Sequence, residues 1–154
     1  MGLFSFLRKP KQPFTPVQME QIVDAIRNAE KQTSGEVRVY VESRNPMVKV
    51  LDRAAEIFYK LKMQETDERN AVLLYLAIKD HEVALFADEG IYKRAGGVYW
   101  ENEMSEMLSH FKTEDITGGI TNCLNHIGAT LKKEFPYDPG TDRNELPDSI
   151  VFGK

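Results

Sequence analysis

The chain has 154 residues, of which 42% are hydrophobic and 29% charged, so we expect one soluble globular domain with a sizeable core. The formal net charge of -4 argues against a general nucleic-acid binder, which needs a basic surface to neutralise phosphates, but it is compatible with cation binding. A single cysteine, Cys123, argues against a disulfide framework and favours a reducing, cytoplasmic compartment.

The segment from Met1 to Gln12, MGLFSFLRKPKQ, places its apolar residues before its basic ones. A secretory signal has the reverse order and a longer apolar region, so we do not interpret this segment as one. A short apolar and basic patch can contact an anionic membrane surface weakly. We favour that alternative less than a frayed or packed terminus.

The first helix is predicted by a capping box. Thr15 can cap the helix, Pro16 suits its first position, and Gln18 completes the box. Apolar residues then recur at three- and four-residue spacing, and Gly35 can end the helix. The following segment Glu36–Glu42 alternates valines with polar residues, which predicts the first strand.

The next three elements form the centre of the predicted fold. The pair Asn45 and Pro46 predicts the start of a second helix. The apolar run 71–78 predicts a buried strand, and the alternating segment 83–87 predicts another after a turn at 80–81. Because a strand, helix and strand form a right-handed crossover, the first two strands should be parallel and the third antiparallel.

The remaining chain is predicted to be mainly helical. A turn at 88–90 and a short connection at 91–97 lead to helices over 98–111 and from about 113 to 131. Gly118 and Gly119 lie inside the last helix, where they indicate close helix packing or, less favoured, a backbone approached by a ligand.

The predicted organisation has three parts. Residues 1–14 form an apolar and basic N-terminal segment, residues 15–136 form a single α/β domain with a mixed sheet, and residues 137–154 form an extended tail that can dock as an edge.

Strand directions gather acidic residues at one edge of the predicted sheet. The first strand begins at Glu36, the second follows the charged stretch 67–70, and the third ends at Asp88. Helices that pack back over the third strand could bring the acidic start of the last helix to the same edge. Hard oxygen ligands that converge from several loops suit Ca²⁺ or Mg²⁺. The candidate metal ligands are Asp88, Glu89, Asp115, Glu36 and Glu114.

Each candidate has a structural alternative. A turn alone is enough to explain Asp88 and Glu89. A favourable interaction with the helix dipole is enough to explain the acidic residues at the start of the last helix. Acidic residues at 101, 103 and 106 are typical of a solvated helix face. The three histidines, at 81, 110 and 126, are scattered, so we do not expect a zinc site, and Cys123 is expected to be inert core.

Several segments recur in an order typical of one family: TSGEVRVYVE (33–42), RNAVLLYLA (69–77), ALFADEGI (84–91), DITGGI (115–120) and NELPDSI (144–150). In these segments the chain resembles the TPM domain family. That family groups thylakoid-lumen proteins of photosystem II repair with many bacterial proteins, and this sequence is similar to small cytoplasmic members of the Bacteroidetes type.

The resemblance implies a three-layer α/β/α sandwich with helices on both faces of a short mixed sheet. It also implies acid phosphatase activity and a Ca²⁺ or other divalent cation in an acidic depression near the strand ends. The matching positions are Asp88 and Glu89, with Asp115 as a further candidate and Glu36 at the start of the first strand.

We therefore expect a module that binds Ca²⁺ or Mg²⁺ and has an accessory or regulatory role, with a protein partner as one option. The alternative is a metal-dependent phosphatase that acts on phosphomonoesters. No nucleophile or general acid can be named from the sequence, and neither can an oligomeric state.

Overall fold

The computed structural model describes residues 13–137 and 150–153. The apolar and basic segment 1–12, with its less favoured alternative of membrane contact, and most of the predicted tail therefore lie outside the described residues. The division of the chain into three parts stays a prediction. Among the described helices, none is long and apolar enough to cross a membrane.

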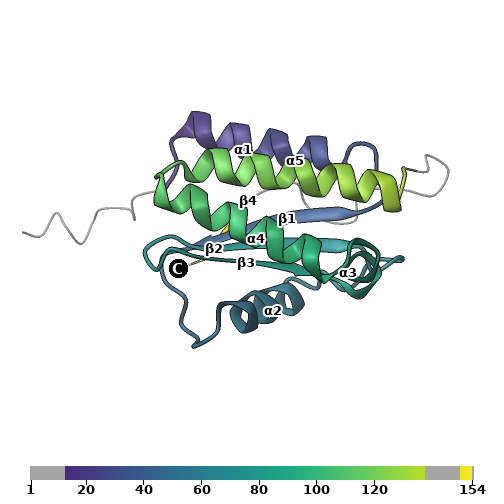
Figure 1. The fold of residues 1–154 in the computed structure, drawn as a ribbon, viewed down its shortest axis with the longest axis horizontal. Coiled ribbons are helices and arrows are strands. Elements are labelled where there is room, and N and C mark those ends of the chain that lie inside the picture. Colours follow the sequence, from purple (N-terminus) through teal and green to yellow (C-terminus); the bar gives the residue numbers. More distant parts are fainter. Residues whose placement is uncertain (1–12, 138–149, 154) are drawn as a thin grey trace, which may run out of the picture.

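The described residues form five helices and a four-stranded sheet (Figure 1). In chain order the elements are α1 (Pro16–Glu30), β1 (Glu36–Glu42), α2 (Val50–Lys60), β2 (Ala71–Ala77), β3 (Glu82–Ala87), α3 (Glu89–Ala95), α4 (Gly97–Lys112), α5 (Ile116–Glu134) and β4 (Ile150–Phe152). The strand order is β3-β2-β1-β4. β1 runs parallel to β2, and β2 runs antiparallel to β3, which confirms the predicted crossover and hairpin.

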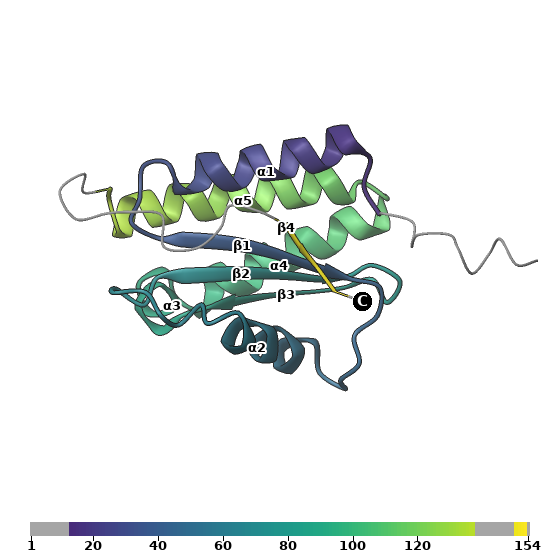
Figure 2. The same ribbon diagram turned by 180° about the vertical axis from the view of Figure 1, so that it is seen from behind.

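The sheet lies between two helical layers. Helices α1, α4 and α5 cover one face, and α2 covers the other (Figures 1 and 2). Successive residues of β1 and β2 point to opposite faces, so Val39 and Leu74 pack in the larger core, and Leu73 and Tyr75 pack against α2. All seven residues of β2 are buried because both faces are covered. The predicted three-layer α/β/α sandwich is confirmed.

Two elements near the turns differ from the prediction. The second helix begins at Val50 rather than at the predicted Asn45 and Pro46. The side-chain oxygen of Asn45 instead accepts a hydrogen bond from the backbone N–H of Met47 (2.9 Å), which forms a turn before the helix. The predicted connection at 91–97 is largely the short helix α3, which Asp88 caps by accepting from the Glu89 N–H. An aspartate in a turn and an aspartate at an N-cap have the same sequence pattern, so the sequence did not separate them.

Close packing explains the glycine pair in α5. A Cβ atom at Gly119 would lie 2.7 Å from the Cβ of His110 on α4, so only glycine permits this approach. Gly118 follows the N-cap residue Asp115, whose side chain accepts from the Gly118 N–H (3.1 Å). The favoured interpretation, helix packing, is therefore confirmed for Gly119, whereas a Cβ atom at Gly118 would meet the side chain of Asp115, the N-cap of the same helix. The result is a tight antiparallel pair of helices, α4 and α5.

Candidate metal centre

Three of the five predicted metal ligands lie at one edge of the sheet. Glu36 opens β1 and is in register with Ala71 at the start of β2, while Asp88 follows the last residue of β3. The backbone N–H of Asp88 donates to the carbonyl of Ala71 (2.9 Å), and Glu89 is the next residue. The predicted strand directions are therefore correct, and Glu36, Asp88 and Glu89 lie at one edge.

Asp88 is neutralised by an arginine. Its carboxylate is 3% exposed and accepts two hydrogen bonds from the guanidinium of Arg69, at 2.7 and 2.8 Å. One oxygen also accepts from the Glu89 N–H (2.8 Å). The hydrogen bond to Asp88 raises the pKa of Arg69. Asp88 thus anchors the start of β2 and caps α3, and both of its oxygens are engaged.

Glu114 and Asp115 do not reach this edge. They line a small cavity of about 130 Å³ together with Ile78, which follows the opposite end of β2. The physical reason is the length of α4, because a helix of 16 residues extends about 24 Å and carries the chain from one end of the sheet to the other. The expectation that all five carboxylates converge is therefore wrong, although metal binding by either group stays a prediction.

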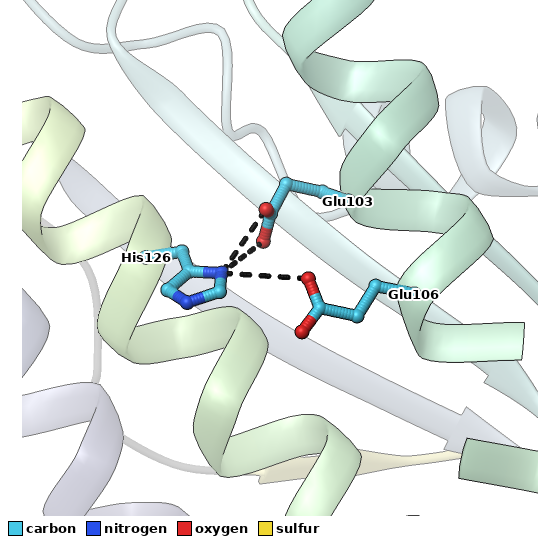
Figure 3. Close-up of side chains that lie close together, drawn as sticks. All are labelled: Glu103, Glu106 and His126. Carbon is cyan, nitrogen blue, oxygen red and sulfur yellow. Dashed lines mark hydrogen bonds and ion pairs between the residues drawn. The ribbon is translucent and has the colours of Figure 1, made fainter. Parts of the chain in front are cut away.

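A different group of potential metal ligands lies between α4 and α5. Glu103 and Glu106 of α4 face His126 of α5 (Figure 3). The Nδ1 atom of His126 lies 3.0 and 3.1 Å from the two oxygens of Glu103 and 3.9 Å from an oxygen of Glu106. One ligand atom from each residue lies within 4.8 Å of the others, and within residues 13–137 and 150–153 no other group of three His, Cys, Asp or Glu does so.

The helix pair creates this arrangement. Residues three apart on a helix share a face, so Glu103 and Glu106 point the same way from α4. Because Gly119 lets the two helices approach closely, the side chain of His126 can span the remaining gap. The three residues therefore meet across a seam between rigid elements rather than on loops.

The charge of the cluster is not balanced. Glu103 is 8% exposed, and burial raises the pKa of its carboxyl group, while the hydrogen bond and charge of His126 oppose that shift. Glu106 accepts a hydrogen bond from the side-chain amide of Asn122 (2.7 Å), which fixes one of its oxygens. Among the described residues, neither carboxylate forms an ion pair with a lysine or arginine. Two carboxylates therefore share one imidazole.

The donor set fits a divalent metal ion. One imidazole nitrogen and two carboxylate oxygens are ligands that first-row transition metals and zinc accept. Side-chain exposure is 42% for His126 and 45% for Glu106, so one side of the group faces solvent. An ion there would compensate the excess negative charge that the protein leaves in place.

Sequence reasoning missed this group. Glu103 was assigned to a solvated helix face, but the structure buries it, and His126 was treated as isolated. A signal was available, since Glu103 and His126 are equally far from the turn at 114–115, and residues equidistant from the turn of an antiparallel helix pair face each other. The sequence alone does not show that the two predicted helices form such a pair.

Comparison with known proteins identifies the family. The family model described as the TPM domain matches residues 8–130. A comparison with curated proteins gives no match. The NMR structure of the BA42 protein from the psychrophilic bacterium Bizionia argentinensis is 35% identical, with a TM-score of 0.85, and the match covers 94% of this chain and 99% of that one.

A second structure shares the fold at much lower identity. It is the N-terminal domain of the cg2496 protein from Corynebacterium glutamicum, which is 11% identical with a TM-score of 0.62. That match covers 77% of this chain and 74% of the other. Since the family model spans most of the residues that build the α/β/α sandwich, the chain belongs to the TPM domain family.

Proposed function

We propose that this TPM domain is a divalent-cation-binding module with an accessory or regulatory role, and that the ion binds to Glu103, Glu106 and His126. The observation that carries the proposal is the convergence of these three side chains within 4.8 Å across the seam between α4 and α5. Metal ligands lie about 2 Å from a zinc-sized ion, so small rotations of the side chains suffice to form a site.

The charge of the cluster supports the same conclusion. Burying a carboxylate without a full counter-charge costs free energy, and the raised pKa of Glu103 reflects that cost. A divalent cation relieves it, while Asn122 holds Glu106 in place through an outer hydrogen bond. Asp88, by contrast, already has the guanidinium of Arg69 as its counter-ion.

The test is a titration of the full chain with Zn²⁺, Mn²⁺, Mg²⁺ and Ca²⁺, monitored in the amide NMR spectrum. The readout is the change in backbone amide chemical shifts or, for paramagnetic Mn²⁺, line broadening. We expect changes centred on Glu103, Glu106 and His126, and their loss in His126→Ala. Glu101→Gln is the matched control, because Glu101 is exposed on the same helix outside the cluster. Changes centred on Asp88 would contradict the proposal and restore the edge predicted from the sequence.

A second candidate function is metal-dependent hydrolysis of phosphomonoesters. It is favoured by one observation, the solvent exposure of Glu106 and His126, because catalytic metal sites keep an open position. A bound metal would polarise the phosphate and lower the pKa of a bound water. The carboxylates would repel phosphate in the metal-free protein.

The hydrolase candidate has its own test. Turnover of a generic phosphomonoester should require added metal, disappear in His126→Ala and Glu106→Gln, and persist in Glu101→Gln. A rate that survives the first two substitutions would come from a contaminant and would remove this candidate.

A further inference from the structure

We infer that the cavity beside the C-terminal end of α4 binds a small zwitterion with an apolar side chain, such as an apolar amino acid or a dipeptide of such residues. The cavity has a volume of about 870 Å³ and lies between the last turns of α4, the turn between β2 and β3 and the start of α5. Pockets for small molecules have volumes of about 300–1,000 Å³. Glu103, Glu106 and His126 do not line this cavity, so the inference does not rest on the proposed metal site.

Apolar side chains form part of the cavity wall. Leu108, Phe111 and Ile116 line it, and Leu108 is 40% exposed. The imidazole of His81 lies nearly parallel to the ring of Phe111, with the ring centroids 5.7 Å apart. An aliphatic or aromatic ligand side chain that covers these surfaces removes apolar area from water. Burial of such area is the main source of affinity in a pocket of this kind.

The lysine and the glutamate of the cavity wall have no partner. Lys112 and Glu114 both line the cavity. Among residues 13–137 and 150–153, neither side chain forms an ion pair or a hydrogen bond, with the other or with a third residue. A zwitterion matches both, because its carboxylate accepts from Lys112 and its ammonium group donates to Glu114. The negative end of the α4 dipole adds to the attraction for the ammonium group.

Glu114 occupies a backbone position that usually belongs to glycine. It follows the C-cap of α4 with φ 59°, and its N–H donates to the carbonyl of Phe111 (3.2 Å). The N–H of Asp115 donates to the carbonyl of His110 (3.0 Å). This is the Schellman arrangement, in which the left-handed residue is usually glycine because a Cβ atom there raises the free energy. The turn itself therefore does not explain a glutamate at this position.

His81 repeats this pattern in the turn between β2 and β3. Its backbone is left-handed (φ 53°), and its N–H donates to the carbonyl of Ile78 (3.3 Å). Glycine is also the usual residue at a left-handed position of a hairpin turn. Of the four left-handed residues other than glycine in the described part of the chain, His81 and Glu114 both line this cavity. Two separate turns thus bring polar side chains to one cavity and lower stability in doing so, which is typical of a binding site.

The test is a titration of the full chain with the dipeptide leucyl-phenylalanine, without added metal, monitored in the amide NMR spectrum. We expect saturable shifts centred on His81, Leu108 and Glu114. The N-acetylated dipeptide lacks the ammonium group, and the dipeptide amide lacks the carboxylate. Because each analogue loses one exposed ion pair, each should bind about fivefold more weakly than the dipeptide.

Two variants separate the roles of the two charges. Glu114→Gly should unfold at a higher temperature than the native chain, because glycine suits the left-handed backbone. It should bind the dipeptide and its N-acetylated form equally, and misfolding cannot explain that loss of discrimination in a more stable variant. Lys112→Met should bind the dipeptide and its amide equally. Glu101→Gln, on α4 outside the cavity, should behave as the native chain does.

Either of two results would overturn the inference. The first is the absence of saturable shifts at millimolar dipeptide. The second is equal binding of the dipeptide and both analogues to the native chain, which would show adsorption to Leu108 and Phe111 without recognition of charge. Neither result bears on the proposed metal site, since no metal is added and its three ligands lie outside the cavity.

Discussion

Two buried carboxylates on opposite faces of the sheet differ in how their charge is compensated. Glu42, on the α2 side, accepts two hydrogen bonds from the guanidinium of Arg53 (2.8 and 2.9 Å) and one from the hydroxyl of Tyr75. Its side chain is 4% exposed. Glu103, on the other face, is 8% exposed and shares one imidazole with Glu106. One cluster is complete, and the other carries excess negative charge.

The difference separates structural carboxylates from candidate ligands. A paired, hydrogen-bonded charge gains nothing from an added cation, because the cation would have to displace a partner already in place. An unbalanced pair of carboxylates on rigid helices gains a counter-ion without any such displacement. Burial alone therefore does not distinguish the two carboxylates, whereas the charges around each of them do.

The largest expected effect comes from breaking the group formed by Glu42, Arg53 and Tyr75. Glu42→Ala leaves Arg53, whose side chain is 15% exposed, without its main partner, and removal of one member of a buried ion pair costs about 3–5 kcal/mol. Urea unfolding measures the change, and the metal affinity should not move. Arg44→Ala is the control, because its pair with Asp80 is exposed and should contribute less than about 1 kcal/mol. Equal losses in the two variants would contradict the comparison.

The next effect comes from forcing α4 and α5 apart. Gly119→Ala places a methyl group 2.7 Å from the Cβ of His110, and overpacking of this kind costs about 1–3 kcal/mol. Metal affinity should fall with stability, because the ligands lie on both helices. Gly97→Ala is the matched control in α4, since its new methyl would meet only the Tyr92 hydroxyl at an ordinary 3.5 Å. Unchanged metal affinity in Gly119→Ala would argue against a site that spans the seam.

Asp88 offers a smaller and more selective test. Asp88→Ala removes the N-cap of α3, which costs about 1 kcal/mol in free energy of unfolding, and it also removes the partner of Arg69. Because the Arg69 side chain is 39% exposed, we expect a total loss above that of the cap alone and below that of Glu42→Ala. If Asp88 is structural, thermal unfolding should shift down while metal affinity stays at the native value. A loss of metal affinity in this variant would place the ion at the edge predicted from the sequence.

The smallest effect at neutral pH concerns Tyr99, beside the incomplete cluster. Burial raises the pKa of Tyr99 to about 12, and the charge of Glu103 adds to the shift. Because the folded-state pKa lies above the unfolded value of about 10, this contribution to stability is present below pH 10 and is lost as the pH rises towards 12. Tyr99→Phe should therefore unfold less readily at alkaline pH, as measured by circular dichroism. An unchanged alkaline transition would show that Tyr99 does not contribute to it.

The fold was predictable from local patterns, and the candidate site was not. The capping box at Thr15, the alternation of Glu36–Glu42 and the apolar run that became β2 each predict one element without knowledge of the others. The burial of Glu103 depends on a neighbouring helix, as does its contact with His126. Neither the burial of Glu103 nor its contact with His126 can be predicted from the residues next to it in the sequence.

The predicted acidic edge shows the same limit. Its location followed correctly from strand directions, but the sequence did not indicate that Arg69 would reach Asp88 with both arms of its guanidinium. Arg69 has a left-handed backbone conformation (φ 51°), which residues other than glycine rarely adopt. The amino-acid sequence does not predict this conformation for an arginine. Ion pairing of this kind is decided by tertiary geometry.

The central claim is that a divalent ion binds at the seam between α4 and α5. Line broadening by Mn²⁺ in the amide NMR spectrum tests it most directly, because the paramagnetic effect falls steeply with distance from the ion. We predict that broadening begins at Glu103, Glu106 and His126 and is absent in His126→Ala. Broadening that begins instead at Glu36, Asp88 and Glu89, and survives in that variant, would contradict the account.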